Sequence, residues 1–135
     1  MLYFAYASNL SKKYMASRCP NALPLKKVVL KNYKLTFNEL ADIIPQEGEE
    51  VVGALYLISK QELEKLDILE GYPDLYDRIT VELEDEFGNK YEALAYTMVE
   101  KNLQAPPDTY YNILVDGYKD WGIEIERLEK AKNFE

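Results

Sequence analysis

Hydrophobic residues recur along the chain with two spacings, one typical of strands and one typical of helices. Short apolar or alternating runs predict five strands, at residues 2–6, 28–37, 51–58, 79–83 and 91–99. Apolar positions at helical spacing predict four helices, at residues 11–18, 59–70, 106–121 and 123–132. Segment 42–50 contains Pro45, Gly48 and several acids, so we expect it to form a loop.

Local sequence signals define the two ends of helix 59–70 and predict which strands pair. Ser59 and Glu62 form a capping box at the start of helix 59–70, and Gly71 stands where a left-handed C-terminal cap is favoured. The turn residues 85–89 predict a hairpin that pairs strands 79–83 and 91–99. Hairpins with helices between them predict an α+β fold, a mixed sheet curled into a small barrel with helices packed around it. The length of 135 residues fits a single domain, 1–135.

Charge and composition narrow the classes of partner. The chain has 24 acidic and 16 basic side chains and a net charge of −8, so it lacks the basic surplus needed for nucleic acid or an anionic membrane. A small anionic substrate is compatible with this charge. No apolar run is long enough to span a bilayer, and the N-terminus lacks a signal-peptide pattern, so we expect a cytoplasmic protein. The sequence leaves the oligomeric state open.

The chain has no histidine, and this restricts its chemistry more than any other feature of composition. Nucleophile systems that depend on histidine and histidine-based metal sites are excluded. The single cysteine, Cys19, cannot hold a zinc ion alone, and we expect it to be buried and unreactive because no base activates it. We therefore expect any acid–base chemistry to come from a carboxyl group, Lys or Tyr.

One carboxyl group stands out against this background. Glu70 shares the apolar stripe of helix 59–70 with Leu63 and Leu66, and it lies at the helix C-terminus, where the macrodipole disfavours negative charge. Burial and the dipole would both raise its pKa, as a proton carrier near neutrality requires. The alternative is that Glu70 only borders the core and contacts water. The neighbouring Asp67 is expected to be a solvated or capping carboxylate.

The turn at residues 6–9 is a second candidate. A strand that turns sharply into a helix exposes backbone N–H groups, which can bind a carboxylate or phosphate. The alternative is an apolar edge strand followed by an ordinary capped helix. Among the 12 tyrosines, Tyr96 is of interest because its strand should pair with strand 79–83. We expect Lys12, Lys13 and Arg18 to be solvated.

Four segments, taken together, resemble the γ-glutamyl cyclotransferase superfamily, which includes the AIG2-like proteins. They are YFAYASNL at 3–10, LDILEGY at 66–72 with Tyr76 after it, AYTM at 95–98, and QAPP at 104–107 followed by Tyr110 and Tyr111. The resemblance covers nearly the whole chain in order. It implies a barrel-like mixed sheet and an intramolecular aminolysis that forms 5-oxoproline from a γ-glutamyl amine or γ-glutamyl amino acid. The reaction that it implies needs no external nucleophile, no metal and no cofactor.

The same resemblance assigns roles to particular residues. Glu70 would be the catalytic acid and base, and Tyr96 would hydrogen-bond the substrate. The turn formed by Tyr6, Ala7, Ser8 and Asn9 would bind the γ-glutamyl head, including its α-carboxylate. The family pattern has Gly where this chain has Ala7, which leaves two hypotheses open: an active cyclotransferase, or a module with the same fold that binds a small carboxylate without turnover.

Overall fold

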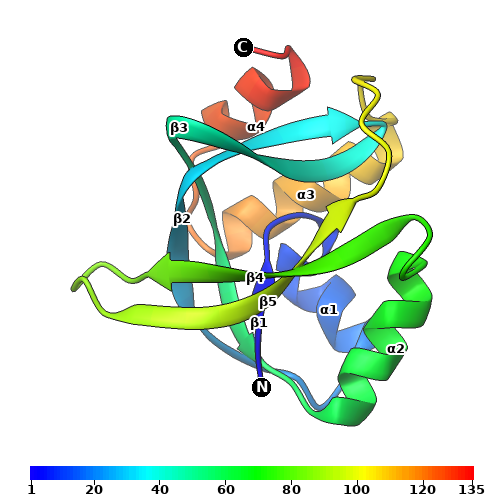
Figure 1. The fold of residues 1–135 in the computed structure, drawn as a ribbon, viewed down its shortest axis with the longest axis vertical. Coiled ribbons are helices and arrows are strands. Elements are labelled where there is room, and N and C mark those ends of the chain that lie inside the picture. The colour runs from blue at the N-terminus through cyan, green and yellow to red at the C-terminus, as the bar shows by residue number, and fades with distance from the viewer.

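The computed structural model describes all residues, 1–135, as five strands, four α-helices and one short 3-10 turn. The strands are β1 (Leu2–Ala5), β2 (Leu23–Asn38), β3 (Leu40–Leu57), β4 (Tyr76–Glu84) and β5 (Lys90–Met98). The helices are α1 (Lys12–Arg18), α2 (Lys60–Glu70), α3 (Asp108–Asp120) and α4 (Glu126–Lys132), and the 3-10 turn is η1 (Ser8–Leu10). Figure 1 shows the helices arranged around the strands.

The strands close into a barrel in the order β1-β3-β2-β4-β5. Strand β1 lies antiparallel to β3, with Leu2 opposite Leu57, and parallel to β5, with Tyr3 opposite Leu94. The other pairs, β2 with β3, β2 with β4, and β4 with β5, are all antiparallel. The predicted mixed sheet curled into a small barrel is confirmed, as is the predicted pairing of the Tyr96 strand with strand 79–83.

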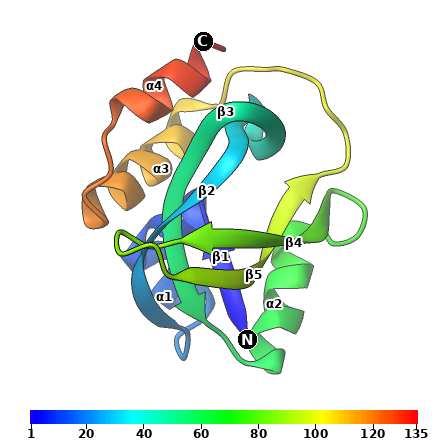
Figure 2. The same cartoon turned by 60° about the vertical axis from the view of Figure 1, so that its left-hand side comes forward.

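The expected loop at 42–50 is wrong, because this segment belongs to the long strand β3. Its pairing with β2 changes from Lys31 opposite Glu50 to Tyr33 opposite Pro45, so residues 46–49, which include Gly48, form a bulge directly after Pro45. The bulge is solvent-exposed, which gives the segment its loop-like composition. Figure 2 shows β2 and β3 as one long, curved hairpin.

The local signals for helix α2 are confirmed. The Ser59 side chain accepts from the Glu62 N–H while the Glu62 carboxylate accepts from the Ser59 N–H, which completes the capping box. Gly71 ends the helix in the left-handed region, with φ of 68°, and its N–H bonds to carbonyls of the last turn. The C-terminal end of α2 is thereby fixed at Glu70.

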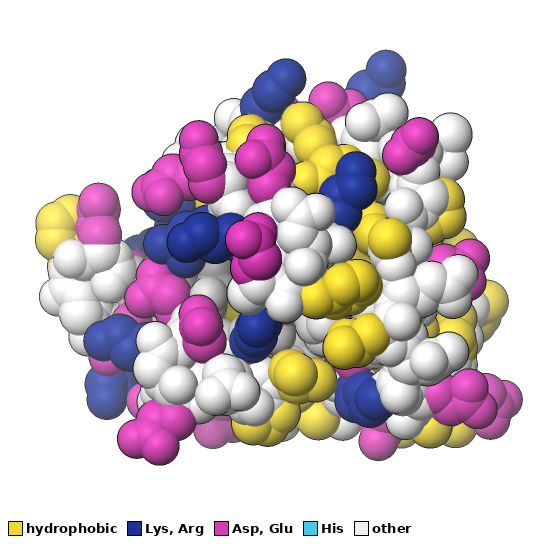
Figure 3. Space-filling view, turned by 90° about the horizontal axis from the view of Figure 1, so that it is seen from above, with side chains coloured by type: hydrophobic (Ala, Val, Ile, Leu, Met, Phe, Trp, Pro, Cys, Tyr) yellow, Lys and Arg dark blue, Asp and Glu magenta, His cyan; other side chains and the backbone are white.

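Acidic and basic side chains intermingle on the face that Figure 3 shows, with hydrophobic groups between them. The net charge of −8 is therefore not gathered into one acidic patch on this face. No helix is both long and apolar enough to cross a membrane.

Helix α3 holds the turn η1 from outside the barrel. A side chain at Gly117 would place its Cβ 2.6 Å from the Ser11 nitrogen and 2.8 Å from the Leu10 carbonyl carbon, so only glycine permits this approach. The indole of Trp121 donates to the Leu10 carbonyl at 2.9 Å, and the Lys12 N–H donates to Asp120 at 2.9 Å. The position of the turn after β1 thus depends on α3.

We predict that Gly117→Ala destabilises the protein although alanine favours helices. The gain in helix propensity is about 1 kcal/mol, whereas overpacking in a close contact costs about 1–3 kcal/mol and pushes η1 away from α3. Urea unfolding measures the net loss. Asn112→Ala, at an exposed position of the same helix, is the matched control and should keep or raise stability. Equal stability changes in the two variants would contradict the prediction.

Candidate active site

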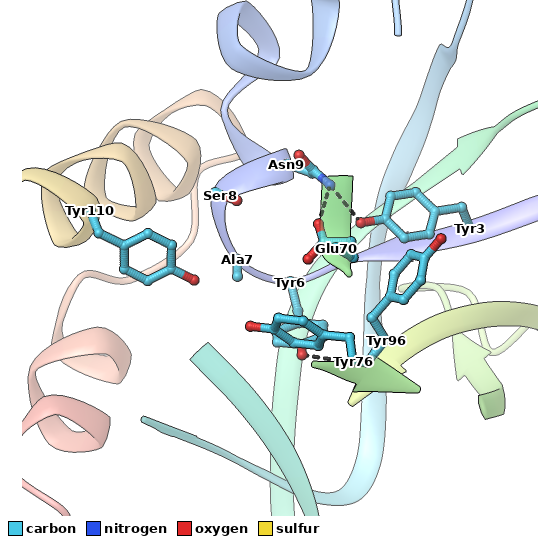
Figure 4. Close-up of a pocket in the computed structure, with 9 residues that line it drawn as sticks. All are labelled: Tyr3, Tyr6, Ala7, Ser8, Asn9, Glu70, Tyr76, Tyr96 and Tyr110. Atoms are coloured by element: carbon cyan, nitrogen blue, oxygen red, sulfur yellow. Dashed lines mark hydrogen bonds between the residues drawn. The ribbon is translucent and has the colours of Figure 1, made fainter. Parts of the chain in front are cut away.

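A single pocket gathers every residue that the sequence proposed for the site. It is lined by Tyr3, Tyr6, Ala7, Ser8, Asn9, Glu70, Tyr76, Tyr96 and Tyr110 (Figure 4). These residues come from β1, the turn after it, α2, β4, β5 and α3. The pocket and its mouth hold about 290 Å³ of space not occupied by atoms. Because β1 and the turn after it are continuous, the fold brings five segments of the chain together at this pocket.

Glu70 lies at the last residue of α2 and points into this pocket. Its side chain is 15% exposed, so it is neither fully buried nor simply solvated. The Asn9 amide lies 3.5 Å from Glu70 Oε1 and donates more closely, at 2.9 Å, to the Tyr3 hydroxyl. Figure 4 shows Asn9 between Glu70 and Tyr3.

Arg18 also contacts Glu70, contrary to the expectation that it would be solvated. Its Nη1 lies 3.3 Å from Glu70 Oε1 and 3.4 Å from Asn9 Oδ1, and its side chain is only 20% exposed. Its Nη2 donates to the Tyr14 hydroxyl at 2.6 Å. Sequence reasoning missed Arg18 because it lies one helix beyond the motif at residues 3–10. Only the direction of α1 in the folded protein places Arg18 next to Glu70.

The turn after β1 lines the pocket and has backbone donors without partners. The carbonyls of Ala7 and Ser8 accept from the Leu10 and Ser11 N–H groups, whereas the N–H groups of Ala7, Ser8 and Asn9 donate to no protein acceptor. Ala7 has φ of −130°, so alanine is not forced into the left-handed region there. Its methyl group lines the pocket. The turn combines free donors with a wall that is one methyl group narrower than glycine would leave it.

Two pocket tyrosines are held by the backbone of one residue of β3, Ala41. The hydroxyl of Tyr76 donates to the Ala41 carbonyl at 2.7 Å, and the hydroxyl of Tyr110 accepts from the Ala41 N–H at 3.0 Å. Figure 4 shows Tyr110 entering from α3, on the opposite side from Tyr3. The hydrophobic pattern singled out neither Tyr76 nor Tyr110, although both lie in the segments that resemble family motifs.

Tyr96 and Tyr6 occupy the β5 side of the pocket. The Tyr6 hydroxyl donates to the Tyr96 carbonyl at 2.7 Å, which ties the end of β1 to β5. The Tyr96 hydroxyl donates to Asp67 Oδ1 at 2.7 Å, and the same oxygen lies 3.7 Å from Arg78 Nε. Asp67 was expected to be solvated or capping, but its carboxylate is a hydrogen-bond partner of a pocket tyrosine.

Residues 3–121 match the protein family described as gamma-glutamyl cyclotransferase, AIG2-like. The chain belongs to this family. The match begins in β1 and ends just after α3, so it contains every residue that lines the pocket. The resemblance carried by the sequence motifs is confirmed.

Relatives of known sequence or structure agree with this assignment. The chain is 30% identical over 147 residues to gamma-glutamylcyclotransferase of Homo sapiens, a match that covers 99% of this chain and 78% of the human protein. A solved gamma-glutamyl cyclotransferase structure has a TM-score of 0.84 at 29% identity and covers 98% of this chain and 86% of its own. YkqA of Bacillus subtilis has a TM-score of 0.81 at 27% identity and covers 99% of this chain and 53% of its own.

Electrostatics distinguishes Glu70 from the other groups in this family pocket. Burial raises the pKa of Glu70 above its ordinary value of 4.5, while Arg18 and Asn9 offset part of that shift. Burial also raises the pKa values of the lining tyrosines, which keeps them neutral. No group of three or more His, Cys, Asp or Glu residues is arranged to hold a metal ion. Glu70 is thus the only carboxyl group that lines the pocket, and its pKa lies above the ordinary value.

We predict a pH-dependent difference in stability between the wild type and Glu70→Gln. The folded state binds the Glu70 proton more tightly than the unfolded state, so the contribution of Glu70 is present below about pH 4.3 and is lost as pH rises through the raised pKa. Glutamine has no proton to lose. The variant should therefore gain stability relative to the wild type by roughly 1.4 kcal/mol per unit of raised pKa.

Urea unfolding of both proteins between about pH 4 and pH 8 measures this difference, because all other titrating groups cancel. A difference between wild type and Glu70→Gln that stays constant or falls with pH would contradict the raised pKa.

Proposed function

We propose that this protein forms 5-oxoproline from a γ-glutamyl amine or γ-glutamyl amino acid by intramolecular aminolysis. The observation that supports this proposal most directly is a desolvated carboxyl group, Glu70, beside the unpaired backbone N–H groups of a tight turn. Both lie in the pocket of a chain that belongs to the AIG2-like γ-glutamyl cyclotransferase family. An intramolecular reaction, in which one part of the substrate attacks another, needs a pocket that holds the substrate and a proton carrier, but no external nucleophile.

In the proposed complex the turn holds the γ-glutamyl head. The free N–H groups of Ala7, Ser8 and Asn9 would donate to its α-carboxylate, because such groups bind anions without a full positive charge. The Tyr96 hydroxyl donates to Asp67, so its oxygen keeps a lone pair that can accept a hydrogen bond from the substrate. These contacts would bring the α-amino group next to Glu70.

Glu70 would then act twice, first as a base and then as an acid. As a carboxylate it takes a proton from the α-ammonium group, and the freed amine attacks the γ-carbonyl carbon to form the ring C–N bond. The bond from this carbon to the leaving nitrogen breaks, and the protonated Glu70 gives its proton to that nitrogen. The ring nitrogen also loses its second proton, which the leaving amine takes up to depart as an ammonium ion. Protons and charge therefore balance, and the carboxylate is restored. A pKa raised by burial suits both steps.

A second candidate function rests on Ala7. Its methyl group lines the pocket where the family pattern has glycine, so the pocket could hold a small carboxylate in a position that does not react. The negative φ of Ala7 favours the enzyme, because alanine is not forced into the left-handed region at this position. Turnover decides between the two.

We predict that the wild type releases 5-oxoproline from at least one member of a panel of γ-glutamyl amines and γ-glutamyl amino acids. Glu70→Gln should lower kcat by at least about 100-fold, the usual contribution of a positioned acid or base. Glu64→Gln on the exposed face of α2 is the matched control and should retain activity. Chromatographic detection of 5-oxoproline measures the rate.

The outcome separates the two functions. Equal rates in the wild type and Glu70→Gln across the whole panel would refute the cyclotransferase. Saturable binding of glutamate or 5-oxoproline by calorimetry, without any turnover, would then establish the binding module.

We predict that Ala7→Gly strengthens substrate binding. Removing the methyl group widens the wall of the pocket beside the free N–H groups, and the negative φ suits either residue. KM should fall about threefold to tenfold, which corresponds to about 1 kcal/mol of relieved crowding. A small loss of stability, about 0.5–1 kcal/mol, accompanies glycine. An unchanged or higher KM would show that the methyl group does not limit access.

A further inference from the structure

Arg18 reaches the catalytic candidate from a different helix. We propose that Arg18 is a positioning residue that fixes the orientation of Glu70 and sets the pH range in which Glu70 can accept a proton. This inference rests on the proposed function for its effect on the rate. Its effect on the Glu70 carboxyl group itself stands independently of any reaction.

The contacts of Arg18 leave its guanidinium group little freedom near Glu70. Its Nη1 lies 3.3 Å from Glu70 Oε1. Its Nη2 donates to the Tyr14 hydroxyl at 2.6 Å, and the guanidinium carbon lies 4.5 Å from the centre of the Tyr14 ring. Arg18 and Tyr14 are four residues apart on α1, so the same helix supplies both the cation and its support.

Arg18 also determines how Asn9 is oriented. Its Nη1 lies 3.4 Å from Asn9 Oδ1, so the amide oxygen faces the cation and the amide nitrogen faces the pocket. That nitrogen donates to the Tyr3 hydroxyl at 2.9 Å and lies 3.5 Å from Glu70 Oε1. With the opposite amide orientation, the Asn9 oxygen would face the Glu70 carboxylate and repel it.

The surroundings of Glu70 offer no other cation to balance its charge. The titratable groups that face it are Tyr3 from β1, Tyr6 from the following turn, Arg18 with Tyr14 from α1, Tyr76 from β4, Tyr96 from β5 and Tyr110 from α3. The tyrosines are neutral, so each leaves the charge of the carboxylate uncompensated. Asp67, three residues earlier on α2, is itself acidic and pairs with Arg78.

This arrangement has a functional consequence. A carboxyl group surrounded only by neutral tyrosines would hold its proton to higher pH and would be available as a base over a narrower pH range. An adjacent, permanently charged guanidinium group favours the ionised form without donating a proton of its own. Arg18 therefore keeps the resting carboxylate ready to act as the base, while burial keeps the protonated form accessible for the second step.

The test measures the Glu70 carboxyl group directly and then the reaction. In Arg18→Gln, the titration of the Glu70 carboxyl carbon, followed by NMR, should move to higher pH by about one unit or more, the usual effect of a charge at this distance. The acid limb of the kcat/KM profile should move by the same amount. Arg18→Lys retains the charge, so its Glu70 titration and its kcat/KM profile should both lie close to those of the wild type.

Two controls keep the result specific. Arg127→Gln removes an arginine that pairs with Glu50 at 3.1 Å outside the pocket, and it should change neither the titration nor the profile. Tyr14→Phe removes the hydroxyl group that holds the guanidinium and should move the Glu70 titration in the same direction by a smaller amount. It serves as the deciding variant if Arg18→Gln fails to fold.

The possible outcomes distinguish this inference from the proposed function. An unchanged Glu70 titration in Arg18→Gln, or in Tyr14→Phe where the first variant does not fold, would overturn the role of Arg18 even if 5-oxoproline is formed. A raised KM with an unmoved pH profile would also overturn it and make Arg18 a substrate-binding residue. A shifted titration in a protein without cyclotransferase activity would support the role of Arg18 and refute only the proposed reaction.

Discussion

The pairing of β1 on both of its edges is the constraint on which the rest of the structure depends. This strand lies antiparallel to β3 on one side and parallel to β5 on the other, which closes the barrel. The chain leaves β1 at Ala5 and turns at once, so the unpaired N–H groups of the turn sit at the end of the barrel. The same strand places Tyr3 beside Asn9 and the pocket. The location of the site follows from barrel closure.

Balance between burial and charge gives the pocket its chemical character. The tyrosines that line it desolvate Glu70 but remain neutral, and Arg18 offsets part of the cost from its place on α1. The first effect raises the pKa of Glu70 and the second lowers it. A carboxyl group that first takes up a proton and then gives it away needs an intermediate pKa. The pocket obtains it from two opposing effects on one carboxyl group, without histidine or a cluster of groups suited to a metal ion.

Support for the site also comes from residues that do not line it. Helix α3 approaches η1 so closely at Gly117 that a side chain there would collide with the turn, and Trp121 holds the Leu10 carbonyl. The backbone N–H and carbonyl of Ala41, at the start of β3, each hold one pocket tyrosine. Helix α3 therefore holds the turn of the pocket, and strand β3 holds two of its tyrosines.

The sequence by itself determined the local elements and the candidate residues. The capping box at Ser59 and the cap at Gly71 depend on neighbouring residues, and the position of Glu70 on an apolar stripe depends on helical spacing alone. Segment 42–50 was mistaken for a loop because bulge residues facing solvent have the composition of a loop, although both flanks remain paired with β2. Only the tertiary structure brought Arg18 to Glu70, 52 residues away, and Tyr110 from α3 into the pocket. Such contacts depend on how helices pack against the closed barrel, which no local pattern encodes.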